Sequence, residues 1–356
     1  MCGIVGCIGL RPVTPILVDA LRRLEYRGYD SAGIATLSDN RVDRRRAEGK
    51  LDRLAERIAE QPLGGQTGIG HTRWATHGVP NETNAHPHTS MGVAVVHNGI
   101  IENFQTLREE LSQAGHSFET QTDTEVVPHL VAHHITAGLS PEEASLAAVR
   151  RLEGAFGLVL LFEGHDDLLV AARRGSPLAI GYGDGEMFVG SDALALAPLT
   201  ERIQYLEEGD VAFVRRDGAR IVDTDGREQH RDIVQTAMSG AMIGKGNHRH
   251  FMEKEIFEQP AVLGDTLRSF ADPSTHRINL PELPFDLRDI TRLTTVACGT
   301  ASYACLVARY WFEQIAGIPT DWEIGSEFRY REPPLVDGQA GLFVSQSGET
   351  ADTLAA

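Results

Sequence analysis

The chain has 356 residues, of which 42% are hydrophobic and 23% charged, and its formal net charge is −17 at pH 7. This composition is typical of a globular protein with two domains, and the acidic charge argues against a binder of nucleic acid or anionic membranes. No apolar run has the length of a membrane span, no signal peptide is evident, and four cysteines without CxxC spacing fit a reducing compartment. We therefore expect a cytoplasmic protein.

The first residues, Met1-Cys2-Gly3, contain a candidate nucleophile. If Met1 is removed, Cys2 carries a thiol and a free α-amine. The thiolate is the reactive form of cysteine, and an α-amine with a pKa of roughly 7.7–8.0 can act as its base. As written, Met1 blocks that amine. The alternative is that Cys2 is a small buried residue of a first strand.

Residues 1–237 are predicted to form one mixed domain with an α+β layered fold. One helix is expected around Ile16–Leu24, a second begins near Thr124, and a third spans Pro141–Arg151 with Ser140 as its N-cap. The expected strands are short apolar runs bounded by Gly or Asp: 3–9, 32–37, 91–96, 155–162, 168–172, 187–189 and 210–214.

Residues 238–288 are predicted to be a linker followed by a helical connection, because a glycine-containing stretch precedes a polar amphipathic helix over about 250–270. From 289 to 356 the pattern becomes α/β. Strands are expected at 293–297, 319–324 and 341–345, and a helix at 301–315. A parallel unit that ends at Ala356 would leave a sheet edge uncovered, so we expect an incomplete domain.

Polar segments of the first domain contain candidate binding residues. Arg73 has a fork that can hold a carboxylate, Asp123 can hold an ammonium, and Asn98-Gly99 has the composition of an oxyanion hole. Each has a structural alternative. Asn98-Gly99 is also a strong hairpin-turn signal, Thr122 or Asp123 can be a helix N-cap, and His71 and His77 can be core histidines with satisfied nitrogens.

The second domain has polar turns between a strand and a helix. The segments 298–302 and 345–350 bring hydroxyls and backbone amides to helix N-termini, which suits a phosphate, although ordinary capped turns would give the same pattern. Metal binding is not indicated, because His129 and His133 lack the glutamate of HExxH and a third ligand. No Walker sequence or GxGxxG follows a strand, and no cofactor is expected.

Taken together, these segments resemble the glutamine–fructose-6-phosphate aminotransferases, also called glucosamine-6-phosphate synthases. The resemblance covers essentially the whole chain. The segments that carry it are 2–6, 24–33, 71–78, 84–88, 97–103 and 122–125 in the first domain, and 298–300, 326–331 and 345–350 in the second. The N-terminal Cys-Gly-Ile alone marks only the wider class II glutamine amidotransferases.

The resemblance implies a four-layer αββα Ntn-hydrolase domain that takes ammonia from glutamine. Cys2 would attack the side-chain amide, and Asn98 and Gly99 would stabilise the oxyanion. Arg73 would hold the substrate carboxylate and Asp123 its ammonium. A loop that closes over glutamine would contain three further residues, Trp74, Thr76 and His77.

The second domain resembles a SIS (sugar isomerase) domain, and the implied ligand is fructose 6-phosphate. The implied binding residues are Thr300, Ser302, Ser345, Gln346, Ser347 and Thr350. The family often has serine directly after Cys-Gly-Thr, where this chain has Ala301, so Ser302 is a doubtful replacement. The implied reaction forms glucosamine 6-phosphate and glutamate for amino-sugar biosynthesis.

Members of the family also have the rest of this SIS domain, a second SIS domain and a C-terminal lysine, and they are expected to dimerise through the SIS domains. We therefore expect the chain to be limited to glutamine hydrolysis. The alternatives are another class II amidotransferase, against which the segment 345–350 argues, and a non-catalytic sugar-phosphate-binding regulator, against which the intact first-domain residues argue.

Overall fold

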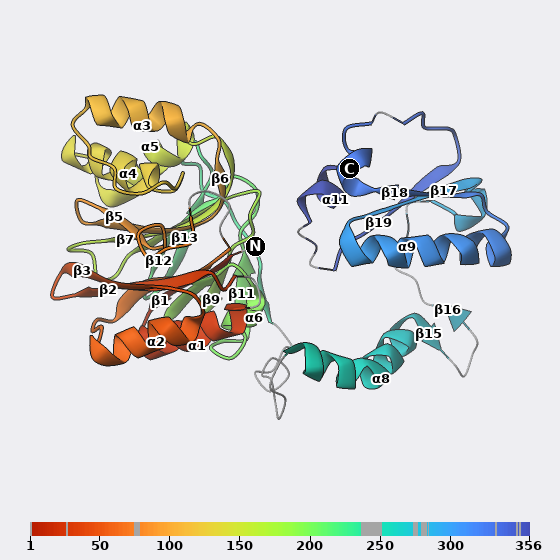
Figure 1. Ribbon diagram of the computed structural model, residues 1–356, viewed down its shortest axis with the longest axis horizontal. Coiled ribbons are helices and arrows are strands. Elements are labelled where there is room, and N and C mark those ends of the chain that lie inside the picture. Colours follow the sequence, from red (N-terminus) through yellow and green to blue (C-terminus); the bar gives the residue numbers. More distant parts are fainter. Residues whose placement is uncertain are drawn as a thin grey trace. The chain divides into compact units, whose positions relative to one another are not determined.

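A computed structural model describes residues 2–25, 28–74, 79–235, 251–272, 277–278, 283, 285–331, 333–346, 348 and 350–356. The chain divides into two units, Met1–Gly246 and Asn247–Ala356 (Figure 1). The division falls inside the linker predicted over 238–288. Each unit is treated by itself below.

The first unit is built on two antiparallel sheets. Within the described residues, the first sheet has 8 strands in the order β14-β11-β9-β10-β1-β4-β2-β3. Its central strand β1 pairs with β4 on one side and with β10 on the other. The bounds are β1 Gly3–Ile8, β2 Ser31–Ser38, β3 Arg41–Glu48, β4 Thr67–Arg73, β9 Ala179–Tyr182, β10 Met187–Gly190, β11 Arg202–Tyr205 and β14 Ile233–Gln235.

The second sheet has 6 strands among the described residues, in the order β13-β12-β8-β7-β6-β5. Its longest pairing joins β6 and β7, from Val93 opposite Phe162 to Ile101 opposite Gly154. The bounds are β5 His88–Ser90, β6 Val93–Ile101, β7 Gly154–Phe162, β8 Leu169–Arg174, β12 Val211–Arg215 and β13 Gly218–Val222.

Helices cover the outer face of each sheet (Figure 1). The first sheet packs on α1 (Thr14–Leu24), α2 (Leu51–Glu60) and the short α6 (Ala193–Leu196). The second packs on α3 (Phe104–Gln113), α4 (Val126–Thr136) and α5 (Pro141–Arg151). A third apolar cluster, which includes Ile4, Ile69 and Val96, fills the space between the sheets. The result is the predicted four-layer αββα fold, which is confirmed.

Local sequence explains most of these elements. Helix α5 begins where predicted, because Ser140 and Glu143 form a reciprocal capping box ahead of Pro141. Helix α2 was not predicted, since only Leu51 and Leu54 of its residues are buried and the rest of its surface is polar. Strand β3 was missed for the same reason: Arg41–Glu48 is mostly polar and lies at the edge of its sheet.

The second unit contains a small parallel sheet in the order β18-β17-β19. Its strands, Arg292–Ala297 (β17), Thr320–Ile324 (β18) and Gln339–Val344 (β19), agree with the predicted ones. Helix α9 (Gly299–Trp311) begins earlier than predicted and ends in a π-helical turn, Phe312–Ala316. The remaining elements are α8 (Phe251–Phe270), β15 (Ala271–Asp272), β16 (Arg277–Ile278), a 3₁₀ turn (Leu287–Asp289), α10 (Gly325–Phe328) and α11 (Ala351–Ala355).

Candidate active site

The candidate nucleophile lies at one end of the layer between the two sheets. Side chains alternate along a strand, so residues an even number apart share a face. Ile4 and Ile8 of β1 belong to the cluster between the sheets, and Cys2 lies two residues before Ile4. On the neighbouring strand β4, Ile69 belongs to the same cluster, and His71 and Arg73 follow it at even spacing.

The second sheet brings Asn98 to the same place. Ala94 and Val96 of β6 belong to the cluster between the sheets, and Asn98 follows them at even spacing. Its side-chain Nδ2 donates a hydrogen bond of 2.9 Å to the backbone oxygen of Cys2. Residues from both sheets thus meet at Cys2, although they are far apart in the sequence.

The Cys2 thiol contacts the backbone of Trp74. The Trp74 N–H donates to Sγ at 3.1 Å, and Sγ lies 3.5 Å from the Trp74 oxygen. Burial raises the pKa of the Cys2 thiol, although the Trp74 hydrogen bond and the Arg73 charge act in the opposite direction. The thiol therefore needs a base when it attacks, and an α-amine on the same residue would supply one.

Asn98-Gly99 is not a hairpin turn. Both residues lie inside β6 and pair with Gly157 and Phe156 of β7, so that alternative is wrong. Gly99 has a φ of +121°, and a Cβ there would lie 2.0 Å from the backbone oxygen of Ala155. Only glycine fits at this position, where the strand departs from regular geometry beside Cys2.

Arg73 and Asp123 are both almost completely buried, with 3% and 4% of their surfaces exposed. Burial lowers the pKa of Arg73, and the nearby charges of Asp30, Cys2 and Asp123 oppose that shift. One Asp123 carboxylate oxygen accepts a hydrogen bond of 2.8 Å from the N–H of Ile101. A cation therefore lies close to the thiol and an anion lies close to that cation, as a zwitterionic amino-acid substrate would require.

The N-cap alternative for Thr122 and Asp123 is also wrong. Helix α4 has Glu125 at its N-cap position, and no side chain caps it. The Thr122 hydroxyl instead lies 3.2 Å from Nε2 of His88. Both side chains point into the domain rather than along the helix.

Trp74 lies at the exit of β4, with 49% of its surface exposed. Its ring makes an edge contact with Tyr29 at a centroid distance of 5.3 Å. The side chain is therefore held beside the candidate nucleophile but remains open to solvent. Thr76 and His77 fall outside the described residues.

A cluster of buried histidines surrounds the site, and the sequence analysis did not predict it as a unit. The Thr124 hydroxyl lies 3.0 Å from Nε2 of His86 and 2.8 Å from Nδ1 of His97. The ring centroids of His71 and His86 are 4.2 Å apart, and those of His86 and His88 are 4.5 Å apart. The signal was present in the histidines of the segment 84–88, but their contacts with 71 and 124 depend on the packing of the two sheets.

Glu125 fixes the segment that leads to Asp123. Its carboxylate accepts hydrogen bonds of 2.8 Å from the N–H groups of Glu119 and Thr120. Burial alone would raise the pKa of Glu125, but hydrogen bonds from His129, Glu119 and Thr120 outweigh it and lower the pKa to about 2. The backbone on either side of Asp123 is held by a carboxylate that stays charged.

In the second unit, the loops after β17 and β19 lie at the same sheet edge. Ala297 is paired with Val344 at the carboxyl ends of these parallel strands, and such edges are where open α/β sheets bind ligands. Thr300 is exposed in the first turn of α9. Ser302 is buried, and its hydroxyl donates to the Gly299 oxygen at 2.7 Å.

The second loop is held by its own hydroxyls. Oγ of Ser345 lies 3.0 Å from Oγ1 of Thr350 and accepts a hydrogen bond of 3.1 Å from the N–H of Gly348. Gln346 lies in the same turn, and Ser347 falls outside the described residues. The loop therefore has a defined shape at the strand edge.

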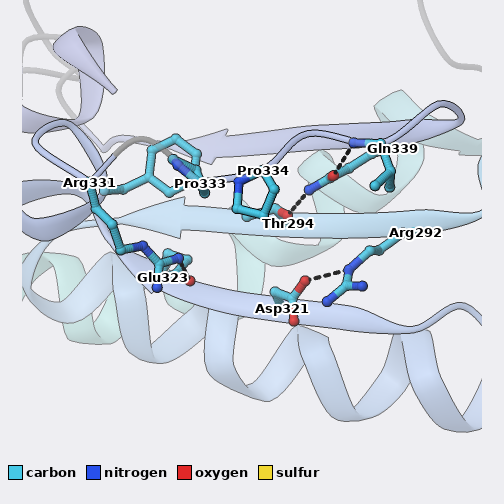
Figure 2. Close-up of a pocket in the computed structure, with 10 residues that line it drawn as sticks. Arg292, Thr294, Asp321, Glu323, Arg331, Pro333, Pro334 and Gln339 are labelled. Atoms are coloured by element: carbon cyan, nitrogen blue, oxygen red, sulfur yellow. Dashed lines mark hydrogen bonds and ion pairs between the residues drawn. The ribbon is translucent and has the colours of Figure 1, made fainter.

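A separate cavity of about 310 Å³ lies along the same sheet, from Arg292 and Gln339 at the start of β17 and β19 to Glu323 and Arg331 at and beyond the end of β18 (Figure 2). Arg292 pairs with Asp321 at 2.7 Å, and Arg331 pairs with Glu323. Gln339 donates to Thr294 at 2.7 Å. The arginines that line the cavity are paired with carboxylates of the protein, so the cavity has less to offer a phosphate than the loops after β17 and β19.

Two domain families match the chain. The glutamine amidotransferase domain matches residues 71–198, and the SIS domain matches residues 286–356. Two solved structures share the fold: glutamine phosphoribosylpyrophosphate (PRPP) amidotransferase from B. subtilis, at 19% identity, and the allosteric regulatory enzyme of purine biosynthesis, at 20%. Each has a TM-score of 0.57; they cover 94% and 97% of this chain, and 69% of each structure is covered.

Fold and site together define a glutamine amidotransferase domain of the Ntn type, followed by part of a SIS domain. Relatives from Mesorhizobium japonicum, Bradyrhizobium diazoefficiens and Zymomonas mobilis are 59%, 57% and 56% identical over 100% of the chain. Each is named glutamine–fructose-6-phosphate aminotransferase (isomerizing). The chain is similar to these relatives over its whole length, and it spans 58% to 59% of theirs.

None of the helices in the described residues is long and apolar enough to cross a membrane. The same residues contain no group of three or more His, Cys, Asp or Glu side chains that could hold a metal ion.

Proposed function

We propose that the chain hydrolyses L-glutamine to glutamate and ammonia, with Cys2 as the nucleophile, and that the complete protein transfers the ammonia to fructose 6-phosphate. The observation that carries the proposal is that an amide donor and a buried cation lie beside one thiol, with a buried anion next to the cation. The Nδ2 of Asn98 lies 2.9 Å from the Cys2 oxygen, and Arg73 and Asp123 are both buried nearby. The name shared by the relatives supports the same reaction.

The reaction follows from these groups. With Met1 removed, the α-amine takes the thiol proton as sulfur bonds to the amide carbon, and the carbonyl electrons move to oxygen. N–H groups of Asn98 and Gly99 would stabilise that oxyanion. Collapse breaks the carbon–nitrogen bond, and the α-ammonium returns its proton to the departing ammonia. Water then hydrolyses the thioester to release glutamate and the free thiol.

Substrate recognition uses the charged ends of glutamine. The guanidinium of Arg73 would hold the α-carboxylate and the carboxylate of Asp123 the α-ammonium. Trp74, Thr76 and His77 would belong to a segment that closes over the substrate. Closure matters because ammonia that escapes into neutral water becomes ammonium and is no longer a nucleophile.

The Cys2→Ala variant tests the proposal. We expect its glutamine hydrolysis to fall at least about 10³-fold, because no other group can form the thioester. Cys7→Ala is the matched control, since Cys7 is buried against α1 rather than in the layer between the sheets, and it should retain activity. Undiminished hydrolysis by Cys2→Ala would refute the assignment, and intact mass would report whether Met1 is present.

For the sugar, we propose that fructose 6-phosphate binds at the loops after β17 and β19, through Thr300, Ser302, Ser345, Gln346, Ser347 and Thr350. The exposed Thr300 should contribute more than Ser302, whose hydroxyl already donates to Gly299. Calorimetric titration with fructose 6-phosphate should show weaker binding for Thr300→Ala and nearly unchanged binding for Ser302→Ala. Equal losses would contradict this placement.

The setting of the reaction is part of the proposal. We propose a cytoplasmic enzyme, whose reducing surroundings would keep Cys2 reduced, and a homodimer for the complete protein. The match of residues 286–356 to the SIS domain favours transfer of ammonia to a sugar phosphate over the reactions of other amidotransferases. A non-catalytic regulator remains the second candidate, which Cys2-dependent hydrolysis would eliminate.

A further inference from the structure

We propose that His71 is a positioning residue, which holds the Asn98 side chain in the one orientation that turns its N–H groups toward Cys2. The proposed chemistry uses Cys2, Asn98, Arg73 and Asp123 but gives no part to His71, although this side chain is 0% exposed and contacts Asn98 directly. The inference rests on the proposed glutaminase function.

Hydrogen bonding fixes which end of the Asn98 amide faces Cys2. The backbone oxygen of Cys2 can only accept, so the atom 2.9 Å from it must be the amide nitrogen. The amide oxygen of Asn98 then faces Nε2 of His71, at 3.1 Å. An oxygen in that position requires a donor opposite it.

A second contact shows that Nε2 of His71 is that donor. The same nitrogen lies 2.9 Å from the backbone oxygen of His97, which is also only an acceptor. Burial lowers the pKa of His71 to about 3, so the ring is neutral at physiological pH and carries one proton. With both neighbours of Nε2 acceptors, that proton belongs on Nε2, and Nδ1 has no hydrogen-bond partner among the described residues.

The orientation matters because an amide is asymmetric. One N–H of Asn98 is directed to the Cys2 oxygen, and the other remains for the oxyanion that forms at the substrate. A flipped amide would turn its oxygen toward the Cys2 oxygen and toward that developing negative charge, so the site would lose a donor and gain a repulsion. Removal of one oxyanion donor typically lowers kcat by about 10²–10³-fold.

The fold explains why His71 can reach Asn98 from β4. Ile4 of β1 pairs with His71, so this ring lies beside the strand that follows the nucleophile, while Asn98 belongs to the other sheet. The His71 side chain crosses the layer between the sheets and fixes the distance and orientation of Asn98 relative to β1. The hydrogen bond to the His97 oxygen extends the same connection to the backbone of β6.

The test compares two substitutions of His71. His71→Leu removes the donor, whereas His71→Gln can place an N–H near the former Nε2. We expect kcat for glutamine to fall about 10²-fold in His71→Leu with KM within about 3-fold, and His71→Gln to recover most of the loss. His134→Leu is the control, since this histidine of α4 contacts the ring of His133 rather than the site, and it should retain kcat.

A double-mutant cycle separates positioning from a purely structural effect. In an Asn98→Ala background, the His71→Leu change should cost less than about 3-fold in kcat, because the group that it orients is gone. Alkylation of Cys2 by iodoacetamide, which forms no oxyanion, should proceed at the rate of the unaltered chain. A multiplicative loss in the double variant, or an unchanged kcat in His71→Leu, would overturn the inference.

One measurement needs neither activity nor a variant. Nitrogen-15 NMR of histidine-labelled chain should show His71 as the Nε2–H tautomer at pH 7, and the Nδ1–H tautomer would overturn the inference. The two proposals fail differently: hydrolysis that does not depend on Cys2 refutes the proposed function, whereas Cys2-dependent hydrolysis that is insensitive to His71→Leu refutes only the positioning role.

Discussion

The two units place polar side chains in opposite ways. In the first, the candidate site lies between two sheets, and its charged and imidazole groups are buried; Arg73, Asp123 and His71 have at most 4% of their surfaces exposed. In the second, the candidate sugar loops lie at the open edge of a parallel sheet, where Thr300 is exposed. A buried site depends on the orientation of each group, whereas an exposed edge depends mainly on backbone shape.

The largest effect is expected for Gly99→Ala, because the packing around Gly99 leaves no room for a Cβ. Gly99→Ala combines a positive φ with a Cβ 2.0 Å from the Ala155 oxygen, so β6 must shift and Asn98 with it. Gly138→Ala is the matched control, because its φ is +99° but nothing lies within 4 Å of a Cβ there.

We expect Gly99→Ala to lower kcat for glutamine by at least about 10²-fold and to destabilise the domain by more than about 3 kcal/mol, against about 1 kcal/mol for the control. Thermal unfolding and initial rates measure both effects. Equal effects of the two substitutions would show that close packing at Gly99 is unimportant.

A smaller effect is expected at Asp123. Asp123→Asn should raise KM for glutamine by roughly 10–100-fold with little change in kcat, because a charge-assisted hydrogen bond contributes about 1.5–3 kcal/mol. Glutaramate, which lacks the α-ammonium, is the matched substrate, and its KM should be similar for both forms of the chain. An unchanged KM for glutamine would mean that Asp123 serves only to hold the Ile101 N–H.

A further comparison distinguishes the units by pH. Burial lowers the pKa of His71 to about 3, and the pKa values of His86 and His88 also lie well below their ordinary value. The unfolded chain, with histidine pKa values of about 6.5, therefore binds more protons than the folded one below that pH. Stability contributed by neutral burial is present above pH 6.5 and is lost as the pH falls.

We expect the free energy of unfolding of the first unit to decrease from pH 7 to pH 5, with a slope approaching about 1.4 kcal/mol per pH unit for each of these histidines. His71→Gln should reduce the slope by the contribution of one histidine, about 1.4 kcal/mol per pH unit. Residues 286–356 contain no histidine, so this part of the second unit should show no comparable histidine-dependent slope in urea titrations. Equal slopes would contradict the role of the buried cluster.

The sequence predicted most of the fold where hydrophobic periodicity was clear. It identified the three strands of the parallel sheet in the second unit and the capped helix after Ser140, but it missed polar edge strand β3 and helix α2, whose buried residues are few, and strand β4, which is buried but has the mixed sequence TGIGHTR. Periodicity reports burial, so elements with little buried surface give little signal.

The candidate site was predicted from motifs rather than from contacts. Cys2, Arg73, Asn98, Gly99 and Asp123 were named, and the structure brings Cys2 together with Asn98 from the other sheet. The turn and N-cap alternatives could not be eliminated from sequence, since both depend on where β6 and α4 begin and end. The contact of His71 with Asn98 was also out of reach, because it arises only when the two sheets pack.

The central claim is that a thioester forms on Cys2. The chain would be mixed with glutamine, quenched in acid within milliseconds, digested and analysed by mass spectrometry. The account predicts a γ-glutamyl adduct on the peptide that contains Cys2, absent from Cys2→Ala. Glutamine turnover without that adduct, or with an adduct on Cys7, Cys298 or Cys305 instead, would contradict it.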